Sequence, residues 1–211
     1  MHTATARSLL SSLLFLALVA AAAPAAANPE GAVEIIESTT GRLTGMIEDN
    51  RDAYKSDLSS LQADVKDVLL PAIDEIYSAR LVLGRHGRGR DNEEIAAFAN
   101  ALIGQLLDRY ASALLDYNLR DRIEILPLAG NNTDRQTRVR TRVDLDSGER
   151  APVDYVLRNT DDGWKIFDVI IEGISYVATF RSQIDQEIRK TSFDDMLKRL
   201  ESGDLEVEID E

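Results

Sequence analysis

Cysteine is absent from the 211-residue sequence. Disulfide bonds, thiolate zinc sites and thiol catalysis are therefore excluded. Basic residues are in the minority, with 24 Lys and Arg against 37 Asp and Glu and a formal net charge of -13. Because proteins that bind duplex DNA or RNA need a basic face, this balance argues against a nucleic-acid partner. The 44% hydrophobic content excludes collagen-like and mostly disordered chains.

The motifs of common catalytic and metal sites are missing as well. There is no G-x-S-x-G, no H-E-x-x-H and no acidic loop with calcium-ligand spacing. Gly84, Gly87 and Gly89 lie between two predicted helices, without the strand that precedes a phosphate-binding loop. His86 has no Ser or Asp at triad spacing, and we expect it to be a solvated loop residue. The sequence therefore predicts neither an enzyme nor a metal or cofactor site.

Residues 1–27 have the organisation of a bacterial-style secretory signal peptide. Arg7 supplies the positive charge, residues 9–23 form an apolar segment, and residues 25–27 offer an A-x-A cleavage site. A retained membrane anchor is the alternative, but the apolar run is shorter than the ~20 residues that span a bilayer. No Cys follows, which excludes lipoprotein attachment. We expect an exported, soluble, periplasmic protein made of residues 28–211.

The expected mature chain is predicted to form one domain, because no linker, internal repeat or low-complexity tract divides it. Asp91 is well placed to cap the longest predicted helix. Pro71 and a glycine-rich loop at residues 84–90 interrupt the helical pattern. Helical spacing of apolar residues predicts helices at about residues 29–50, 57–70, 72–83 and 92–117.

Beyond residue 118 the apolar period changes to two, which is typical of antiparallel strands with one wet face. Gly173 is expected to end the sheet, and helical spacing returns from Ile174, with Ser192 beginning a last helix. Residues 202–211 form an acidic tail that is expected to fray. The order of elements predicts an α+β fold. The strands are expected at about residues 123–125, 138–145, 153–158 and 164–171.

Two clusters of arginines each have two interpretations. One alternates along a predicted strand and contains Arg138, Arg140 and Arg142. We favour a solvated strand face paired with acids such as Asp154 over a docking patch for an acidic partner or lipid head groups. The other cluster lies in the loop at residues 84–90 and contains Arg85, Arg88 and Arg90. It is either a contact for anionic phosphates or a solvated turn.

Four stretches of the chain resemble the MlaC, or toluene-tolerance, family of periplasmic phospholipid-binding proteins. The similarity extends over about residues 31–201, although the loop after the third helix is short and glycine-rich and the long helix lacks the usual Thr-Pro start. The stretches are Val68-Leu69-Leu70-Pro71, Leu81-Val82-Leu83-Gly84-Arg85-His86, the run GWKIFDVIIEGIS at residues 163–175, and Phe180-Arg181-Ser182-Gln183.

The resemblance implies a twisted antiparallel sheet packed with helices around a deep apolar lipid pocket, in an NTF2-like or MlaC-like arrangement. It implies a monomeric carrier that binds phospholipid acyl chains without a cofactor. Such a carrier shuttles lipid between an outer-membrane lipoprotein complex and an inner-membrane ABC transporter complex and so maintains outer-membrane lipid asymmetry. A subgroup of the family is associated with hopanoids, so a hopanoid ligand is also open.

The predicted lipid contacts are apolar side chains at the seam between helices and sheet. Periodicity alone does not distinguish a lined cavity there from a solid core. The predicted contacts are Tyr77, Leu81, Phe98, Leu102, Leu106, Tyr110, Val139, Val143, Tyr155, Trp164, Ile166, Ile170, Ile174 and Val177.

An enzyme is the main alternative, since similar cone-shaped α+β folds host isomerases. Asp168 lies on a strand that is apolar near its end and would act as a pocket acid beside Tyr155 or Tyr176. A structural salt bridge or hydrogen bond explains Asp168 more simply. A plain interaction module with a filled core is the third possibility.

Overall fold

The computed structural model describes residues 28–116, 122–145 and 147–208. In these ranges six α-helices and a five-stranded antiparallel sheet are joined by short turns, which confirms the predicted α+β class. The predicted signal peptide, residues 1–27, lies outside the described residues. Within the part of the chain that is described, no helix is both long and apolar enough to cross a bilayer.

The first two helices, α1 and α2, form a hairpin. α1 spans Glu30–Ser56, several residues beyond its predicted end, and α2 spans Leu58–Leu69. Asp57 caps α2 by accepting a hydrogen bond from the backbone N–H of Ser60 at 3.2 Å. Hydrogen bonds from the side chains of Ser59 and Ser60 lower the pKa of Asp57 to about 2. This exposed carboxylate therefore caps α2 at the point where the chain reverses.

Pro71 separates α2 from α3, as the sequence predicts. It lies in the 3-10 turn η1, Leu70–Ala72, and α3 follows at Glu75–Leu83. The glycine-rich loop after α3 contains a second 3-10 turn, η2, at Gly84–Gly87. Gly84 has a φ of 54°, a backbone conformation that other residues rarely adopt, so glycine suits the end of α3.

α4 begins at the predicted N-cap and spans Asn92–Tyr110. Asp91 accepts a hydrogen bond from the Glu94 backbone N–H at 2.8 Å, while the Glu94 carboxylate accepts one from the Asp91 N–H at 3.2 Å. This reciprocal capping box explains why α4 starts here. The helix ends earlier than predicted, because the chain tightens into the 3-10 turn η3 at Ala111–Leu115.

The sheet is an antiparallel meander in the order β1-β2-β3-β4-β5, as the alternation of apolar residues predicts. A register shift between Val156 and Leu157 leaves Phe167 unpaired, because Val156 lies opposite Asp168 and Leu157 opposite Ile166. Such a bulge interrupts the alternation of side chains along β4. The strands span Ile123–Ile125, Gln136–Asp144, Arg150–Thr160, Gly163–Ile171 and Ile174–Ser175.

The sheet continues beyond the end predicted at Gly173. Glu172 and Gly173 have positive φ values of 52° and 88°, and the tight turn that they form lets Ile174 and Ser175 pair back onto β4. The Ser175 hydroxyl then caps α5, Tyr176–Lys190, by accepting the N–H of Ala178 at 3.1 Å. This short hairpin directs α5 away from the end of β4.

The last helix, α6, spans Phe193–Ser202 and begins at Ser192, as predicted. The expectation that the tail frays is wrong for residues 203–208. Leu205 and Val207 are buried, and the Gln105 amide on α4 accepts the Val207 N–H at 2.8 Å. Gln183 on α5 holds the backbone of Glu208 in the same way, at 2.7 and 3.0 Å. Because Leu205 and Val207 are two positions apart, both side chains face the helical core, while Glu206 between them faces solvent.

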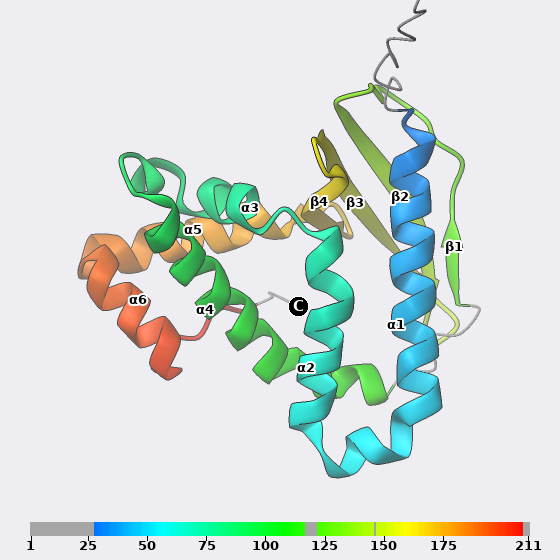
Figure 1. Cartoon of the computed structure of the whole chain (residues 1–211), viewed down its shortest axis with the longest axis horizontal. Coiled ribbons are helices and arrows are strands. Elements are labelled where there is room, and N and C mark those ends of the chain that lie inside the picture. Colours follow the sequence, from blue (N-terminus) through cyan, green and yellow to red (C-terminus); the bar gives the residue numbers. More distant parts are fainter. Residues whose placement is uncertain (1–27, 117–121, 146, 209–211) are drawn as a thin grey trace, which may run out of the picture.

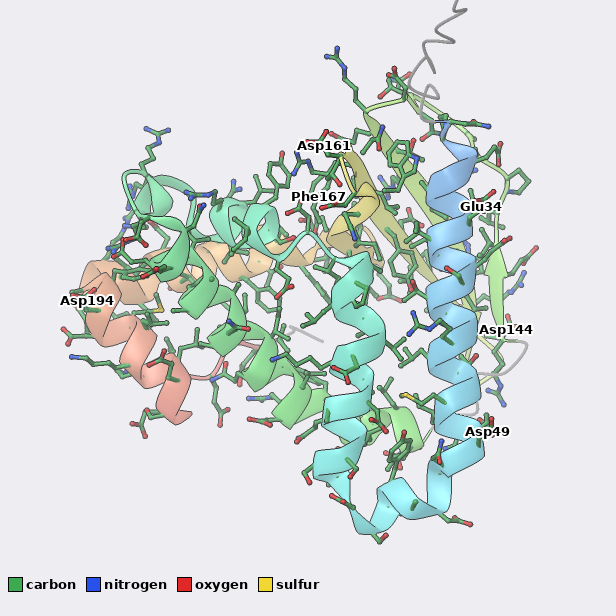
Figure 2. All side chains as sticks on the ribbon, viewed as in Figure 1. Glu34, Asp49, Asp144, Asp161, Phe167 and Asp194 are labelled. Atoms are coloured by element: carbon green, nitrogen blue, oxygen red, sulfur yellow. The ribbon has the colours of Figure 1, made fainter. Side chains whose placement is uncertain are left out.

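Figure 1 shows two groups of elements with α2 between them: the sheet with α1 on one side, and α3, α4, α5 and α6 on the other. α1 packs on one face of the sheet around Ile36, Val139 and Trp164. The helical group has its own core around Phe98 and Met196, to which the buried tail belongs. Acidic side chains such as Glu34 on α1 and Asp194 on α6 are exposed (Figure 2).

Candidate functional site

A mainly apolar cavity of about 200 Å³ lies where β4 meets α3, α4 and α5, at the junction of the two groups of elements. Apolar and aromatic side chains dominate its wall, and its polar groups belong to Glu75, Ser78, Asp168 and the hydroxyl of Tyr176. The lining residues are Ile73, Glu75, Ser78, Ala79, Ala99, Leu102, Ile103, Leu106, Ile166, Phe167, Asp168, Val169, Tyr176, Val177 and Phe180.

Leu102, Leu106, Ile166 and Val177 are the predicted lipid contacts that line this cavity. The sequence did not single out their neighbours Ala79, Ala99 and Phe180, because small or buried residues at helical spacing look like ordinary core. Consecutive residues of β4, from Ile166 to Val169, line the cavity together. The bulge at Phe167 explains this run, since strict alternation would have turned every second side chain away.

The other predicted contacts do not line this cavity. Val139, Tyr155 and Trp164 belong to the core beneath α1, where burial also raises the pKa of Tyr155. Phe98 is fully buried in the core of the helical group, and Ile174 is 51% exposed. Leu81 lines a separate groove on the surface. The remaining positions, also outside the cavity lining, are Tyr77, Tyr110, Val143 and Ile170.

Strand register explains why several of these residues lie away from the cavity. Val139 lies opposite Tyr155 across β2 and β3, so both project to the sheet face that α1 covers. The sequence identifies which residues share a face, but it does not say which face meets α1 and which edge meets the cavity. Tyr77 lies outside the lining for a different reason: its ring packs edge-on against the ring of Phe167, with centroids 5.2 Å apart. Phe167 is labelled in Figure 2. Tyr77 therefore contacts a residue of the cavity wall without lining the cavity itself.

Each carboxylate oxygen of Asp168 accepts a hydrogen bond from the start of α5. Its Oδ2 accepts from the Ser175 hydroxyl at 2.6 Å, and its Oδ1 accepts from the backbone N–H of Val177 at 3.1 Å. A carboxylate beside the first N–H groups of a helix stabilises that helix end. Asp168 therefore fixes the start of α5 against β4, which is the structural hydrogen-bonding role expected for it.

The other polar groups of the lining have local roles too. The Ser78 hydroxyl donates to the backbone carbonyl of Phe167 at 3.0 Å, which joins α3 to β4. Burial raises the pKa of Tyr176, whose ring lies 5.9 Å from that of Phe180, and the phenol stays neutral at ordinary pH. In the described ranges no cluster of three or more His, Cys, Asp or Glu residues is arranged to hold a metal ion.

The two arginine clusters differ from each other. Arg138 on β2 pairs with Asp154 on β3 at 2.5 and 2.9 Å, which confirms the cross-strand pairing expected for the strand cluster. In the loop cluster, for which the sequence leaves a phosphate contact and a solvated turn both open, Arg85 pairs with Asp185 at 2.6 Å and Arg90 with Glu94 at 2.5 Å. His86 is half-buried and lies 2.7 Å from Asp185 on α5, so the prediction of a solvated loop histidine is wrong. The hydrogen bond from His86 is the main cause that lowers the pKa of Asp185.

Comparisons with known proteins agree with this architecture. The chain is 27% identical over 162 residues to the toluene tolerance protein ttg2D of Pseudomonas putida, covering 76% of this chain and 74% of that protein. It is 26% identical over 147 residues to the intermembrane phospholipid transport system binding protein MlaC of Haemophilus influenzae, covering 67% of each.

A solved structure has the same fold. The phospholipid-binding protein of Ralstonia solanacearum, determined in complex with a phospholipid, superposes with a TM-score of 0.72 at 21% identity, covering 81% of this chain and 95% of that one. The sequence pattern of the MlaC protein family matches residues 37–202, most of the described chain. By this match the chain belongs to the MlaC family.

Proposed function

We propose that the protein is a carrier that binds the acyl chains of a phospholipid in the cavity between β4 and the helices α3, α4 and α5. The observation that carries the proposal is the chemistry of this cavity. Its wall is apolar, and the oxygens of Asp168 and Ser78 at the wall are engaged in hydrogen bonds within the protein. Such a surface offers an acyl chain mainly dispersion contacts, with the oxygens of Asp168 and Ser78 already paired.

The same bonds disfavour the isomerase alternative. A general base must point toward the proton that it abstracts, whereas Asp168 is held toward the start of α5. Both oxygens of Asp168 accept hydrogen bonds from Ser175 and Val177, and Tyr155 belongs to the core beneath α1 and not to the cavity wall. We infer that the wall binds a ligand and does not transform it.

A whole phospholipid is larger than the present cavity. Pockets for small molecules typically enclose roughly 300–1,000 Å³, whereas this cavity holds about 200 Å³. Binding would therefore widen the apolar seam between β4 and the helical group. The seam suits this movement because the helical group and the sheet with α1 have separate cores. Each core would keep its packing while the surfaces between them part.

Transfer energetics suit a carrier. Moving one methylene from water to an apolar site gains ~0.8 kcal/mol, so two full acyl chains taken from water would be held close to the limit of non-covalent affinity. A lipid taken from a bilayer only exchanges one apolar environment for another, so its release to a second membrane costs little. Partner proteins would act by lowering the kinetic barrier that the lipid meets when it crosses water.

Export and partners complete the proposal. Residues 1–27 would direct the chain to the periplasm and be removed there, leaving one domain from residue 28. The carrier would meet an outer-membrane lipoprotein complex and an inner-membrane ABC transporter complex in turn, through transient contacts. The relatives named for phospholipid transport and phospholipid binding support this route. A hopanoid would occupy the same apolar wall, and the ligand must be identified directly.

Mass spectrometry of lipid extracted from protein purified out of its native periplasm tests the proposal. We expect about one phospholipid per chain. Leu106→Glu would place a charge in the cavity wall and empty it. Ile174→Glu is the matched control, because Ile174 is half-exposed and lies outside the cavity. Wild-type protein without lipid, or equal loss of lipid in both variants, would contradict the assignment of this cavity. Co-purified hopanoid would replace phospholipid as the ligand.

A further inference from the structure

A second hollow, of about 660 Å³, lies on the surface between α5 and the segment formed by α3 and η2. Four guanidiniums line it, from Arg80, Arg85, Arg88 and Arg181, together with the carboxylate of Asp185. We call this hollow the arginine groove. α3 and α5 also wall the apolar cavity, but with other residues, such as Ala79 and Phe180. The groove is therefore a separate site beside the cavity.

Three of these arginines have no acidic partner within the part of the chain that the structure describes. Arg80 donates to the side-chain carbonyl of Asn92 at 2.8 Å, and Arg181 donates to the backbone carbonyl of Leu81 at 2.5 Å. Arg88 is exposed and its guanidinium has no partner among the described residues. Each of these side chains keeps N–H donors available for an anion, since a guanidinium carries five.

The one acid of the groove is already shared. The Asp185 carboxylate lies 2.6 Å from the Arg85 guanidinium and 2.7 Å from the His86 imidazole. The guanidinium of Arg189, on the next turn of α5, lies 2.9 Å from it. One carboxylate thus faces two guanidiniums and an imidazole, so it does not neutralise the groove. A local excess of positive charge stands out on a chain with a formal net charge of -13.

We propose that the arginine groove is a docking site for an acidic peptide segment of a partner protein. Guanidiniums bind carboxylates in a bidentate geometry. The apolar residues of the groove, including Leu81 and Ala178, would contact the peptide side chains that lie between the acidic ones. This inference goes beyond lipid carriage and does not depend on it.

Shape and charge favour a peptide over an anionic bilayer. A narrow chain enters a hollow, whereas a flat bilayer meets the whole face around it. Exposed charges interact over a Debye length of about 8 Å at physiological ionic strength, so a bilayer would also meet the exposed acids that follow the groove loop in the chain, such as Asp91 and Glu93. The groove gives local attraction to a peptide without adsorbing the protein to membranes.

Fluorescence anisotropy with the full chain tests this site. The probe is a fluorescein-labelled peptide of alternating Glu and Gly, and the matched peptide alternates Gln and Gly. We expect the acidic peptide to bind with a Kd that rises with salt, and the neutral peptide not to bind. The triple variant Arg85→Gln, Arg88→Gln, Arg181→Gln is expected to raise the Kd about tenfold or more.

A control variant removes three exposed cations away from the groove, by Arg42→Gln, Arg135→Gln and Lys198→Gln. It changes the net charge equally and is expected to leave the Kd within about twofold. If the triple groove variant lowers the melting temperature, Arg88→Glu alone decides the matter, because Arg88 has no contact to lose among the described residues. It should weaken binding several-fold with unchanged unfolding.

Three outcomes would overturn the proposal. One is equal weakening by the groove and control variants, which would indicate nonspecific charge attraction. Another is binding to vesicles of anionic phosphatidylglycerol, with no binding of the acidic peptide, which would assign the groove to a membrane surface. The third is groove-dependent self-association in analytical ultracentrifugation without peptide binding, which would assign it to a second copy of the chain.

Discussion

The Ser175 hydroxyl donates a hydrogen bond to the Asp168 carboxylate, with an Oγ···Oδ2 distance of 2.6 Å. Ser175 also caps α5 through the same oxygen, which accepts the N–H of Ala178. The other Asp168 oxygen accepts the N–H of Val177. β4, β5 and the first turn of α5 are thus joined at one point on the cavity wall. The sequence alone does not show that these groups meet.

The first prediction concerns Asp168. Asp168→Ala removes both hydrogen bonds and leaves donors unpaired, so we expect a loss of about 1–3 kcal/mol in the free energy of unfolding. Asp161→Ala, in the exposed β3–β4 turn, should change stability by less than about 0.5 kcal/mol. Urea denaturation measures both. Asp168→Asn should keep its bound lipid, since a carrier needs no base at this position. A loss of lipid with unchanged stability would contradict the structural role.

The second prediction uses two alanines of α4. Ala99 lines the cavity, whereas Ala97 lies in a surface groove between α4 and α6. Ala99→Phe fills the cavity and should lower the ratio of extracted lipid to protein, with an overpacking cost of about 1–3 kcal/mol. Ala97→Phe should leave lipid content and stability near those of the wild type. Equal lipid content in the two variants would place the ligand elsewhere.

The third prediction compares two glycines of α1. Nothing lies within 4 Å of a Cβ added at Gly45, so Gly45→Ala should stabilise the helix by about 0.5–1 kcal/mol. A Cβ at Gly31 would lie 3.0 Å from the Trp164 ring, so Gly31→Ala should lose that gain and disturb the ring. Trp164 is the only tryptophan, and its fluorescence reports the disturbance directly. An unchanged spectrum in Gly31→Ala would mean that α1 does not pack here as described.

The fourth prediction concerns pH. The pKa of Asp57 is lowered from 3.8 to about 2 by hydrogen bonds from Ser59 and Ser60. A lowered pKa means that the ionised cap stabilises the fold above about pH 4 and that this contribution is lost as pH falls toward 2. The melting temperatures of wild type and Asp57→Ala should therefore differ at neutral pH and converge below about pH 4. A difference that is independent of pH would show that the charge of Asp57 is unimportant.

Local features of this protein could be predicted from the sequence because they depend on near neighbours. Asp91 and Ser192 cap α4 and α6 as expected, and Pro71 separates α2 from α3. The alternation of apolar residues predicted the antiparallel meander, and a cation and an acid on adjacent strands predicted the pair of Arg138 with Asp154. Each of these depends on backbone dihedral angles or on a short-range register that the residues themselves favour.

Other features depend on contacts between distant parts of the chain. His86 meets Asp185, 99 residues away, and the tail is held by Gln105 and Gln183 although its composition resembles a frayed end. The spacing of apolar residues along the sequence does not predict contacts between residues so far apart.

The sequence by itself determined that this chain has the helices, the meander and the apolar residues of an MlaC-family protein. Only the tertiary structure decided which of those residues surround the cavity. Alternation along a strand assigns residues to two faces but does not name what covers each face. α1 covers the face that contains Val139, and the bulge at Phe167 brings four consecutive residues of β4 to the cavity. Packing between whole elements, and not local preference, therefore determines which residues line the cavity.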